Sequence, residues 1–323
     1  MKAAITGAAS VRDGELADRL AWLPETVRVR ALRAEQITQL ALAATGDALA
    51  AAGSVVLEGP PRPDVGVAVG TAFGCFLTNA AYQRRVGADG TRVASPRLFA
   101  ATVSNAAAGE VGIGYRLGGP AITLSAGSAA GLLAIGHAAD LVASARTRAM
   151  VAGGVDASGP ALERWLADGG LPAGEAPIGG AAGIVVLERA GAVEGRSPRR
   201  TLGAVLGYGA GFGRPGDARG VSAAIAQALA DARVRAGDVA LVVLEGASVA
   251  ADQAQRVLRT ALGGAVATRV RPLRDGTERF AAGGPLALLA TLADVAPDAP
   301  FLVLHPCASG HVAAMIATRT DGA

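Results

Sequence analysis

Residues Gly119–Asp156 read GPAITLSAGSAAGLLAIGHAADLVASARTRAMVAGGVD. A Gly-Pro break precedes Ala121–Ser125, whose β-branched and small residues predict a short buried strand. Apolar residues then recur at helical spacing from Ser128 to about Ser144, and Ala149–Val155 predicts a second strand. Ser128 therefore stands at the start of a helix, where free backbone N–H groups and the helix dipole stabilise negative charge. A small residue that a strand delivers to such a position is typical of a nucleophile site.

Strands and helices alternate along the rest of the chain. Further strands are predicted at Lys2–Gly7, Val65–Gly70, Gly183–Glu188, Leu202–Gly207, Ala240–Leu244 and, as the last one, Phe301–Leu304. Helices are predicted at Ala34–Ala52, Val221–Arg235, Asp252–Leu262 and Phe280–Ala293. This alternation predicts an α/β fold built in layers, with a second half that repeats the order of the first.

The composition excludes several classes of protein. The chain has 323 residues, of which 51% are hydrophobic, and a formal net charge of +3. It has no basic stripe with interleaved aromatic residues and no apolar run long enough to span a bilayer, so we expect neither a nucleic-acid nor a membrane partner. Met1–Gly7 is too short and too lightly charged for a signal peptide. Cys75 and Cys307 form no metal motif or disulfide framework and are expected to be small core residues, so we expect a cytoplasmic protein without metal or cofactor.

The central stretch resembles the nucleophile segment of the β-ketoacyl-acyl carrier protein synthases, or ketosynthases, of the thiolase fold. Gly119-Pro120 matches the Gly-Pro of that family, Ile135–Ala139 matches its helix body, and Ala152–Gly154 matches the end of its second strand. Ser95–Asn105 resembles the family segment that crosses the subunit interface. The resemblance implies a thiolase-like fold with two pseudo-repeated halves in a layered α-β-α-β-α arrangement. The halves would be residues 1–190 and 191–323 of one compact unit.

The resemblance also shows which catalytic groups are replaced. The family's catalytic Cys falls on Ser128, and its two catalytic His fall on Ala247 and Thr277. None of the chain's three histidines lies between residues 138 and 304, where both His-bearing turns must fall; they are His137, His305 and His311. Without imidazoles there, the chain has no group suited to acid–base work at neutral pH or to holding a thioester in those turns. We therefore expect no condensing or decarboxylating activity from this chain alone.

These losses are similar to those of the chain-length factors, the non-catalytic partners of ketosynthases in type II polyketide synthases. The resemblance implies a heterodimer with an active ketosynthase subunit, a carrier protein that brings the growing chain, and a shared chain tunnel. Phe73 falls in a turn where the family places a pocket-lining side chain. Leu98, Phe99 and Asn105 fall on the segment that crosses the interface.

Other interpretations of the same residues stay open at this point. Ser128 is either a small helix cap or an acyl-carrying nucleophile with His311 as its base, which would make the chain a Ser-dependent acyltransferase. A stand-alone acyl-binding protein is a further alternative. Phe73 and Leu98 are equally compatible with ordinary core positions, and His137 with a structural role inside its helix.

Overall fold

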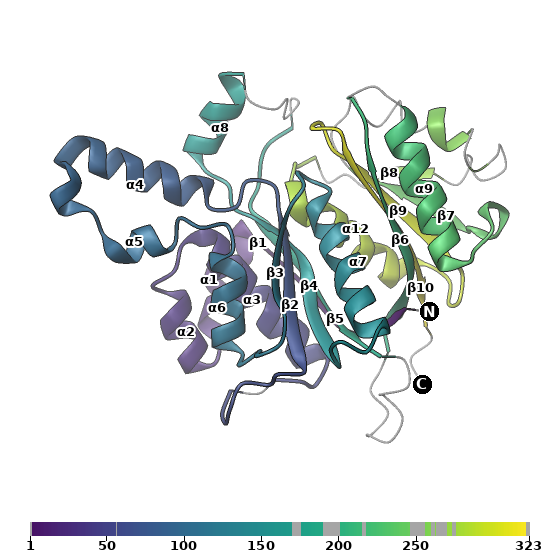
Figure 1. Cartoon of the computed structure of the whole chain (residues 1–323), viewed down its shortest axis with the longest axis horizontal. Coiled ribbons are helices and arrows are strands. Elements are labelled where there is room, and N and C mark those ends of the chain that lie inside the picture. The colour runs from purple at the N-terminus through teal and green to yellow at the C-terminus, as the bar shows by residue number, and fades with distance from the viewer. Residues whose placement is uncertain are drawn as a thin grey trace.

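The computed structural model describes residues 2–55, 57–169, 176–189, 201–214, 218–245, 256–259, 262, 270–272 and 276–320. In this part of the chain ten strands form one sheet, in the order β3-β2-β4-β5-β1-β6-β10-β9-β7-β8 (Figure 1). The strands are β1 (Ala3–Arg12), β2 (Val65–Thr71), β3 (Ala121–Ser125), β4 (Ala149–Asp156), β5 (Ala181–Glu188), β6 (Gly203–Phe212), β7 (Leu241–Leu244), β8 (Val270–Pro272), β9 (Phe301–Pro306) and β10 (His311–Arg319). The helices include α1 (Asp13–Trp22), α2 (Glu25–Ala31), α3 (Gln36–Ala51), α4 (Phe76–Asp89), α5 (Pro96–Ala100), α6 (Ala106–Gly114), α7 (Ala130–Ala143), α8 (Pro160–Ala167), α9 (Ala218–Ala232) and α12 (Gly283–Asp294), with short 3-10 turns η1 (Thr91–Val93), η2 (Ala236–Asp238) and η3 (Phe280–Ala282).

The sheet is symmetric about the contact between β1 and β6. Outward from that contact, one side has the order β1-β5-β4-β2-β3 and the other has β6-β10-β9-β7-β8. On each side the first two pairings are antiparallel and the last two are parallel. The predicted α/β fold with two repeated halves is therefore confirmed. Residues 190–200 lie outside the described residues, and the exact boundary between the halves, at 190 and 191, stays a prediction.

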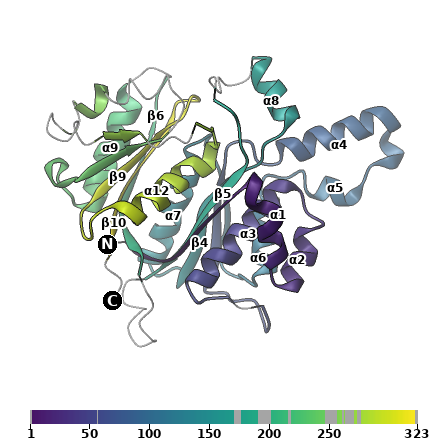
Figure 2. The same ribbon diagram turned by 180° about the vertical axis from the view of Figure 1, so that it is seen from behind.

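Helices cover both faces of the two half-sheets. Helix α3 packs on β1, β5 and β4, whereas α9 packs on β6 and β10. Helices α7 and α12 lie between the half-sheets and contact strands of both (Figures 1 and 2). Nine of the 14 residues of α7 are buried, as expected for a helix that is covered on most sides. The result is the predicted α-β-α-β-α layering.

Two predictions about strands are wrong. Ala121–Ser125 forms β3 but none of its residues is buried, because among the described strands β3 lies at an edge of the sheet and pairs only with β2. Phe301–Leu304 is not the last strand, because β10 follows it and lies between β9 and β6. The sequence of β10, HVAAMIATR, has few of the β-branched and aromatic residues that mark strands. The predicted helix at Asp252–Leu262 lies largely outside the described residues.

The chain's single lysine joins the two halves near the N-terminus. Lys2 forms ion pairs with Asp140 on α7 and with Asp231 on α9, the second at 2.6 Å. The Tyr208 hydroxyl on β6 donates to Asp140 at 2.9 Å, and the Lys2 ammonium lies 5.1 Å from the centre of the Tyr208 ring. This cluster connects the middle helix layer with the outer layer of the second half.

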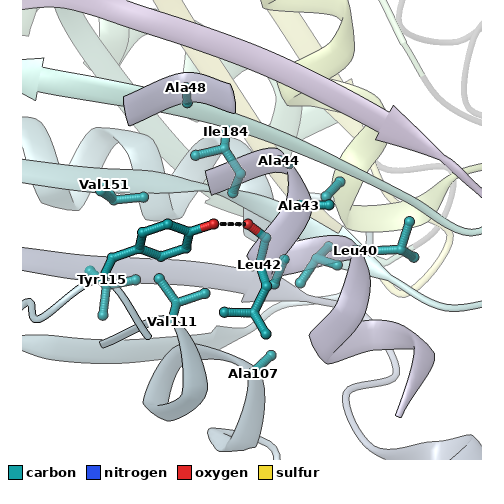
Figure 3. Packing of buried hydrophobic residues seen from close by; sticks show 14 of the residues in the cluster. Leu40, Leu42, Ala43, Ala44, Ala48, Ala107, Val111, Tyr115, Val151 and Ile184 are labelled. Atoms are coloured by element: carbon teal, nitrogen blue, oxygen red, sulfur yellow. Dashed lines mark hydrogen bonds between the residues drawn. The ribbon is translucent and has the colours of Figure 1, made fainter. Parts of the chain in front are cut away.

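The core of the first half is built around Tyr115, which follows α6. Its side chain is fully buried, and its hydroxyl donates to the Leu42 carbonyl of α3 at 2.7 Å (Figure 3). The ring lies in a cluster that includes Val111, Val151 and Ile184 (Figure 3). Burial raises the pKa of the Tyr115 hydroxyl, so this group stays a hydrogen-bond donor. Tyr115 therefore fixes the spacing between α3 and α6.

This spacing gives a double-mutant test. Tyr115→Phe should lower the free energy of unfolding by about 1 kcal/mol, the usual net worth of a hydrogen bond. Gly46→Ala should lower it by about 1–3 kcal/mol, because the added methyl group would overlap the Tyr115 hydroxyl oxygen and lie 3.1 Å from Leu23 Cδ2. The double variant should lose less than the sum, because the nearest remaining ring atom, Cζ, would be 3.4 Å away.

Urea denaturation measures the three free energies of unfolding. Gly14→Ala is the matched control, because no atom of the described residues lies within 4 Å of its added methyl group, and it should change the free energy of unfolding by less than about 1 kcal/mol. Strictly additive losses in the double variant would show that Tyr115 does not set the distance between α3 and α6.

Candidate functional site

The turn that carries Ser128 joins β3 to α7. Gly127 has a φ of +56°, and Ser128 and Ala129 precede Ala130, the first residue of α7. The Ser128 side chain is half-buried, and its hydroxyl makes no hydrogen bond within the described residues. The interpretation of Ser128 as a helix cap is wrong, because Ala129 holds the cap position and no side chain caps this end of α7.

A hairpin loop between β9 and β10 packs against this turn. The Cys307 N–H donates to the His311 carbonyl at 2.8 Å, and the Gly310 N–H donates to the Cys307 carbonyl at 2.9 Å. Gly310 has a φ of +93°, so a glycine closes the loop at the position that demands a left-handed backbone. The loop brings Cys307 to the turn that carries Ser128, where the Ser128 N–H donates to Cys307 Sγ at 3.2 Å.

Two more side chains, those of Ser309 and His311, form a chain of polar contacts that begins at the Cys307 sulfur. Cys307 Sγ lies 3.1 Å from Ser309 Oγ, which lies 3.1 Å from His311 Nδ1. Phe212 packs edge-on against the His311 ring with the ring centres 4.9 Å apart. Sequence reasoning missed Ser309 and treated Cys307 as an apolar filler. The sequence Cys-Ala-Ser-Gly-His could have indicated this cluster, because a glycine just before the last residue fits a short hairpin loop. Such a loop brings its first and last residues close together.

Asp156 anchors the other side of the site from the end of β4. Its carboxylate is buried and accepts hydrogen bonds from the Thr71 hydroxyl at 2.7 Å and from the Phe73 and Ala281 N–H groups at 3.0 Å each. The Ala72 N–H also donates to it, at 3.0 Å. Burial raises the pKa of Asp156, and these four donors oppose that shift. The carboxylate thereby fixes the turn after β2 and the 3-10 turn η3 relative to each other.

Phe73 belongs to a cluster of four aromatic rings beside Asp156. Its ring centre lies 4.7 Å from that of Phe280, 6.1 Å from Trp165 and 6.5 Å from Phe76, all in edge-to-face geometry. Phe280 is buried and has a φ of +46°, which is strained for a bulky side chain and costs of the order of 1–3 kcal/mol. The contact with Phe73 and the tie of Ala281 to Asp156 hold it there. Sequence reasoning named only Phe73 of these rings.

The positions predicted to replace the two catalytic histidines are only partly described. Thr277 is half-buried and follows Gly276, just before η3. The segment that contains Thr277 leads into η3, and η3 contacts α7, because the Ala281 carbonyl packs against Gly131 in the first turn of that helix. Ala247 lies outside the described residues. The assignment of Thr277 and Ala247 to the two histidines stays a prediction.

The first half of the chain matches a known family. Residues 2–165 match the family profile described as β-ketoacyl synthase, N-terminal domain. The chain belongs to the β-ketoacyl synthase family. It is 30% identical over 256 residues to the actinorhodin polyketide putative β-ketoacyl synthase 2 of Streptomyces coelicolor. The aligned region covers 71% of this chain and 61% of that protein. It is 30% identical over 235 residues to the 3-oxoacyl-(acyl-carrier-protein) synthase 2 of Vibrio cholerae, which covers 62% of this chain and 54% of that protein. The chain thus spans 54–61% of the length of these two relatives.

Solved structures of ketosynthases have the same fold. The ishigamide ketosynthase/chain length factor superposes with a TM-score of 0.81 at 21% identity, over 99% of both chains. A type II polyketide synthase acyl-carrier protein in complex with its ketosynthase bound to the hexaketide gives a TM-score of 0.78 at 18% identity, over 98% of this chain and 99% of that chain. These likenesses establish the thiolase-like fold of the β-ketoacyl synthases for this chain.

Two of the three residues predicted to cross the subunit interface, Leu98 and Phe99, lie on a projecting arm of this β-ketoacyl synthase fold. Helices α4 and α5 extend away from the body in both views (Figures 1 and 2). On α5, Leu98 is half-buried and Phe99 is 61% exposed, with its ring centre 5.6 Å from that of Tyr82. Asn105 is exposed at the start of α6. The described helices include none that is both long and apolar enough to cross a bilayer.

His305 is a buried imidazole that sequence reasoning left without a role. It lies near the end of β9 and is entirely buried, and among the described residues neither of its ring nitrogens has a hydrogen-bond partner. Its ring lies beside Gly283 and Gly284 at the start of α12 and close to Leu132 of α7. Burial lowers the pKa of His305 to about 4. The ring is therefore neutral at physiological pH.

This neutral His305 predicts a defined pH dependence of stability. An unfolded chain binds a proton at His305 below about pH 6.5, whereas the folded chain binds it only near pH 4, so the stabilisation is complete above pH 6.5 and lost as the pH falls toward 4. The free energy of unfolding of wild type minus that of His305→Leu should fall by about 3 kcal/mol between pH 7 and pH 4. Urea denaturation at several pH values measures it.

Thr291→Val is the control, because it changes a buried, non-titrating side chain on α12, the helix that packs against His305. It should keep the wild-type dependence of the free energy of unfolding on pH. An unchanged slope in His305→Leu would mean that His305 binds its proton equally in the folded and unfolded chain.

Proposed function

We propose that this chain is the chain-length factor of a type II polyketide synthase, the cytoplasmic and non-catalytic partner of an active ketosynthase. One observation carries the proposal: a chain with the fold and family of the β-ketoacyl synthases has Ser128, Ala247 and Thr277 where catalytic residues are expected. The similarity to the actinorhodin protein and to the ishigamide ketosynthase/chain length factor supports it. In this proposal residues 1–190 and 191–323 act as two halves of one unit.

The partner surface in this proposal is the open edge of β3 together with α5 and α6. In the part of the chain that the structure describes, the backbone of β3 is paired only on its β2 side, so its other edge offers ladder positions to a strand from a partner. Three large apolar side chains nearby are exposed; they are Phe99, Val103 and Ile113, at 61%, 52% and 59%. Stable protein pairs of this kind bury roughly 2,000 Å² or more in total. A ketosynthase subunit that covers this surface would explain why an edge strand and its neighbours carry apolar residues.

In the proposal, the growing chain arrives on an acyl carrier protein and extends toward the aromatic cluster around Phe73. The four rings of Phe73, Phe76, Trp165 and Phe280 form one aromatic wall, and Ala281, next to Phe280, packs with its carbonyl against the first turn of α7 and against β4. Such a wall limits chain length sterically, because forcing extra methylene groups into a close-packed interior costs roughly 1–3 kcal/mol.

The Ser-dependent acyltransferase finds no support in the geometry. Within the described residues Ser128 Oγ has no hydrogen bond to His311, whose Nδ1 lies 3.1 Å from Ser309 Oγ instead. A nucleophile requires its base within hydrogen-bond reach, directly or through a water molecule. The chain-length factor is therefore the function that we propose.

The loss of the catalytic residues predicts the behaviour of the purified chain. Incubated alone with malonyl-carrier protein, it should release no CO2 above the buffer rate, and it should co-purify as a one-to-one complex with an active ketosynthase. Ser128→Cys should also be silent, because no histidine stands in either predicted catalytic turn. Radioactive CO2 release and size-exclusion chromatography provide the measurements. Decarboxylation by the chain alone, or a stable monomer in the presence of the ketosynthase, would contradict the proposal.

The aromatic wall predicts a change in product length. In the reconstituted complex, Phe73→Ala should admit at least about one more two-carbon unit, because it opens the wall, whereas Leu98→Trp should shorten the product by filling the interface side of the tunnel. Mass spectrometry of the products gives the lengths. Trp22→Ala is the control, since Trp22 is 85% exposed on α1, far in the sequence from both segments. A wild-type length distribution from an assembled, active Phe73→Ala complex would remove Phe73 from the tunnel.

A further inference from the structure

The hairpin loop of residues 307–311 assembles a nucleophile, a hydroxyl relay and a base from five consecutive residues. We propose that Cys307 accepts acyl groups from thioesters, with Ser309 and His311 moving its proton. The choice of thioester as the substrate class rests on the proposed function, whereas the geometry of the three side chains does not. This activity is separate from condensation, because it forms no carbon–carbon bond.

The three side chains form one continuous path for a proton. Cys307 Sγ lies 3.1 Å from Ser309 Oγ, and Ser309 Oγ lies 3.1 Å from His311 Nδ1. In the productive arrangement the thiol donates to the hydroxyl and the hydroxyl donates to Nδ1, so the imidazole carries its own proton on Nε2. Phe212 packs against the ring and restricts its orientation. Cys307 thus reaches a histidine base through one hydroxyl group, in the way that a nucleophile can reach its base through one water molecule.

The sulfur also lies where negative charge is stabilised. The Ser128 N–H donates to Cys307 Sγ at 3.2 Å, at the N-terminal end of the 14-residue helix α7. Backbone N–H groups and the helix dipole at such a position stabilise the negative charge that passes through the sulfur during attack. Cys307 thus lies beside the N-terminal end of α7, the place that the sequence assigned to Ser128.

A buried polar group, with no hydrogen-bond partner among the described residues, lies on β9 just before this loop. The ring of His305 lies beside Gly284 of α12 and Leu132 of α7, and Cys307 Sγ, two residues further on, lies at the turn before α7. His305 is entirely buried, and neither ring nitrogen has a partner among the described residues. Burying such a group without a hydrogen bond is costly unless something polar satisfies it. The carbonyl oxygen of an acyl group on Cys307 would bring an acceptor to this end of β9.

The proposed step balances without any further reactant. Cys307 passes its proton through Ser309 to His311, and the thiolate attacks the carbonyl carbon of the incoming thioester. The new S–C bond forms as the bond from that carbon to the original sulfur breaks. His311 returns the proton to the departing thiolate, which leaves as a free thiol. The products are S-acyl-Cys307 and one thiol.

Cys75 is an internal control for this proposal. Both cysteines are 8% exposed, so accessibility alone does not separate them. Cys75 Sγ contacts the Thr102 carbonyl and lies 3.0 Å from the Asn79 amide nitrogen, and it has no histidine among these partners. A difference in acylation rate between the two thiols therefore reports the surroundings of Cys307.

The test treats the full-length chain with S-hexanoyl-N-acetylcysteamine and follows acylation by intact mass and peptide mapping. We expect one hexanoyl group on Cys307, formed at least about tenfold faster than on Cys75. His311→Gln and Ser309→Ala should each slow the acylation of Cys307 by about 100-fold, the lower end for loss of a general base. Cys75→Ser should keep the wild-type rate at Cys307.

Each alternative outcome has a distinct pattern. Equal rates at both cysteines in the wild type, an unchanged rate in both His311→Gln and Ser309→Ala, or the acyl group on Ser128 would overturn the proposal. Circular dichroism and thermal melting show whether a variant is folded. If His311→Gln is unfolded, its two cysteines would react at similar rates, and the acylation rate of Ser309→Ala then tests the proposal. Because no ketosynthase is present, failure here leaves the pairing of the chain with its partner unaffected. Loss of that pairing would likewise not change the labelling result.

Discussion

The buried carboxylate of Asp156 is the interaction on which the site depends. It accepts hydrogen bonds from the turn after β2 and from η3, two segments that come from different halves of the chain. Charge-assisted bonds of this kind are roughly twice as strong as neutral ones, and removing the acceptor would leave several buried donors without partners. The carboxylate therefore fixes both Phe73 and Phe280, and with them the aromatic wall beside α7.

Close backbone packing makes this arrangement possible. The Ala281 carbonyl of η3 lies against Gly131 of α7 and Gly154 of β4, where any side chain would overlap it. The middle helix layer can lie between the two half-sheets because residues at its contacts are so small. Packing of this kind needs small residues at the contacts, which is consistent with the 45 glycines and the few aromatic residues of the chain. Four of those aromatic residues gather in one cluster, which concentrates the bulky side chains at the proposed end of the tunnel.

The fold of this chain rests on packing and not on the residues at its predicted catalytic positions. The strand order, the directions of pairing and the nucleophile helix follow from apolar patterning and small-residue contacts, which do not depend on a catalytic cysteine or histidine. With Ser128 in the turn, the space at the start of α7 is occupied from the other half by Cys307. The helix terminus that stabilises negative charge is present at this position, and a thiol lies against it.

The sequence by itself determined most of the strands and their alternation with helices, because strand and helix periodicity are local properties, but it did not indicate β10. It also determined the family, through the motif around Ser128, and most of the fold class followed from these. Only the tertiary structure decided that β3 is an exposed edge, since its apolar pattern is the same whether its neighbour belongs to this chain or to another. Only the tertiary structure brought Cys307 to Ser128, which lies 179 positions away. Contacts over such distances depend on how the two half-sheets pack, and no local pattern in the sequence records them.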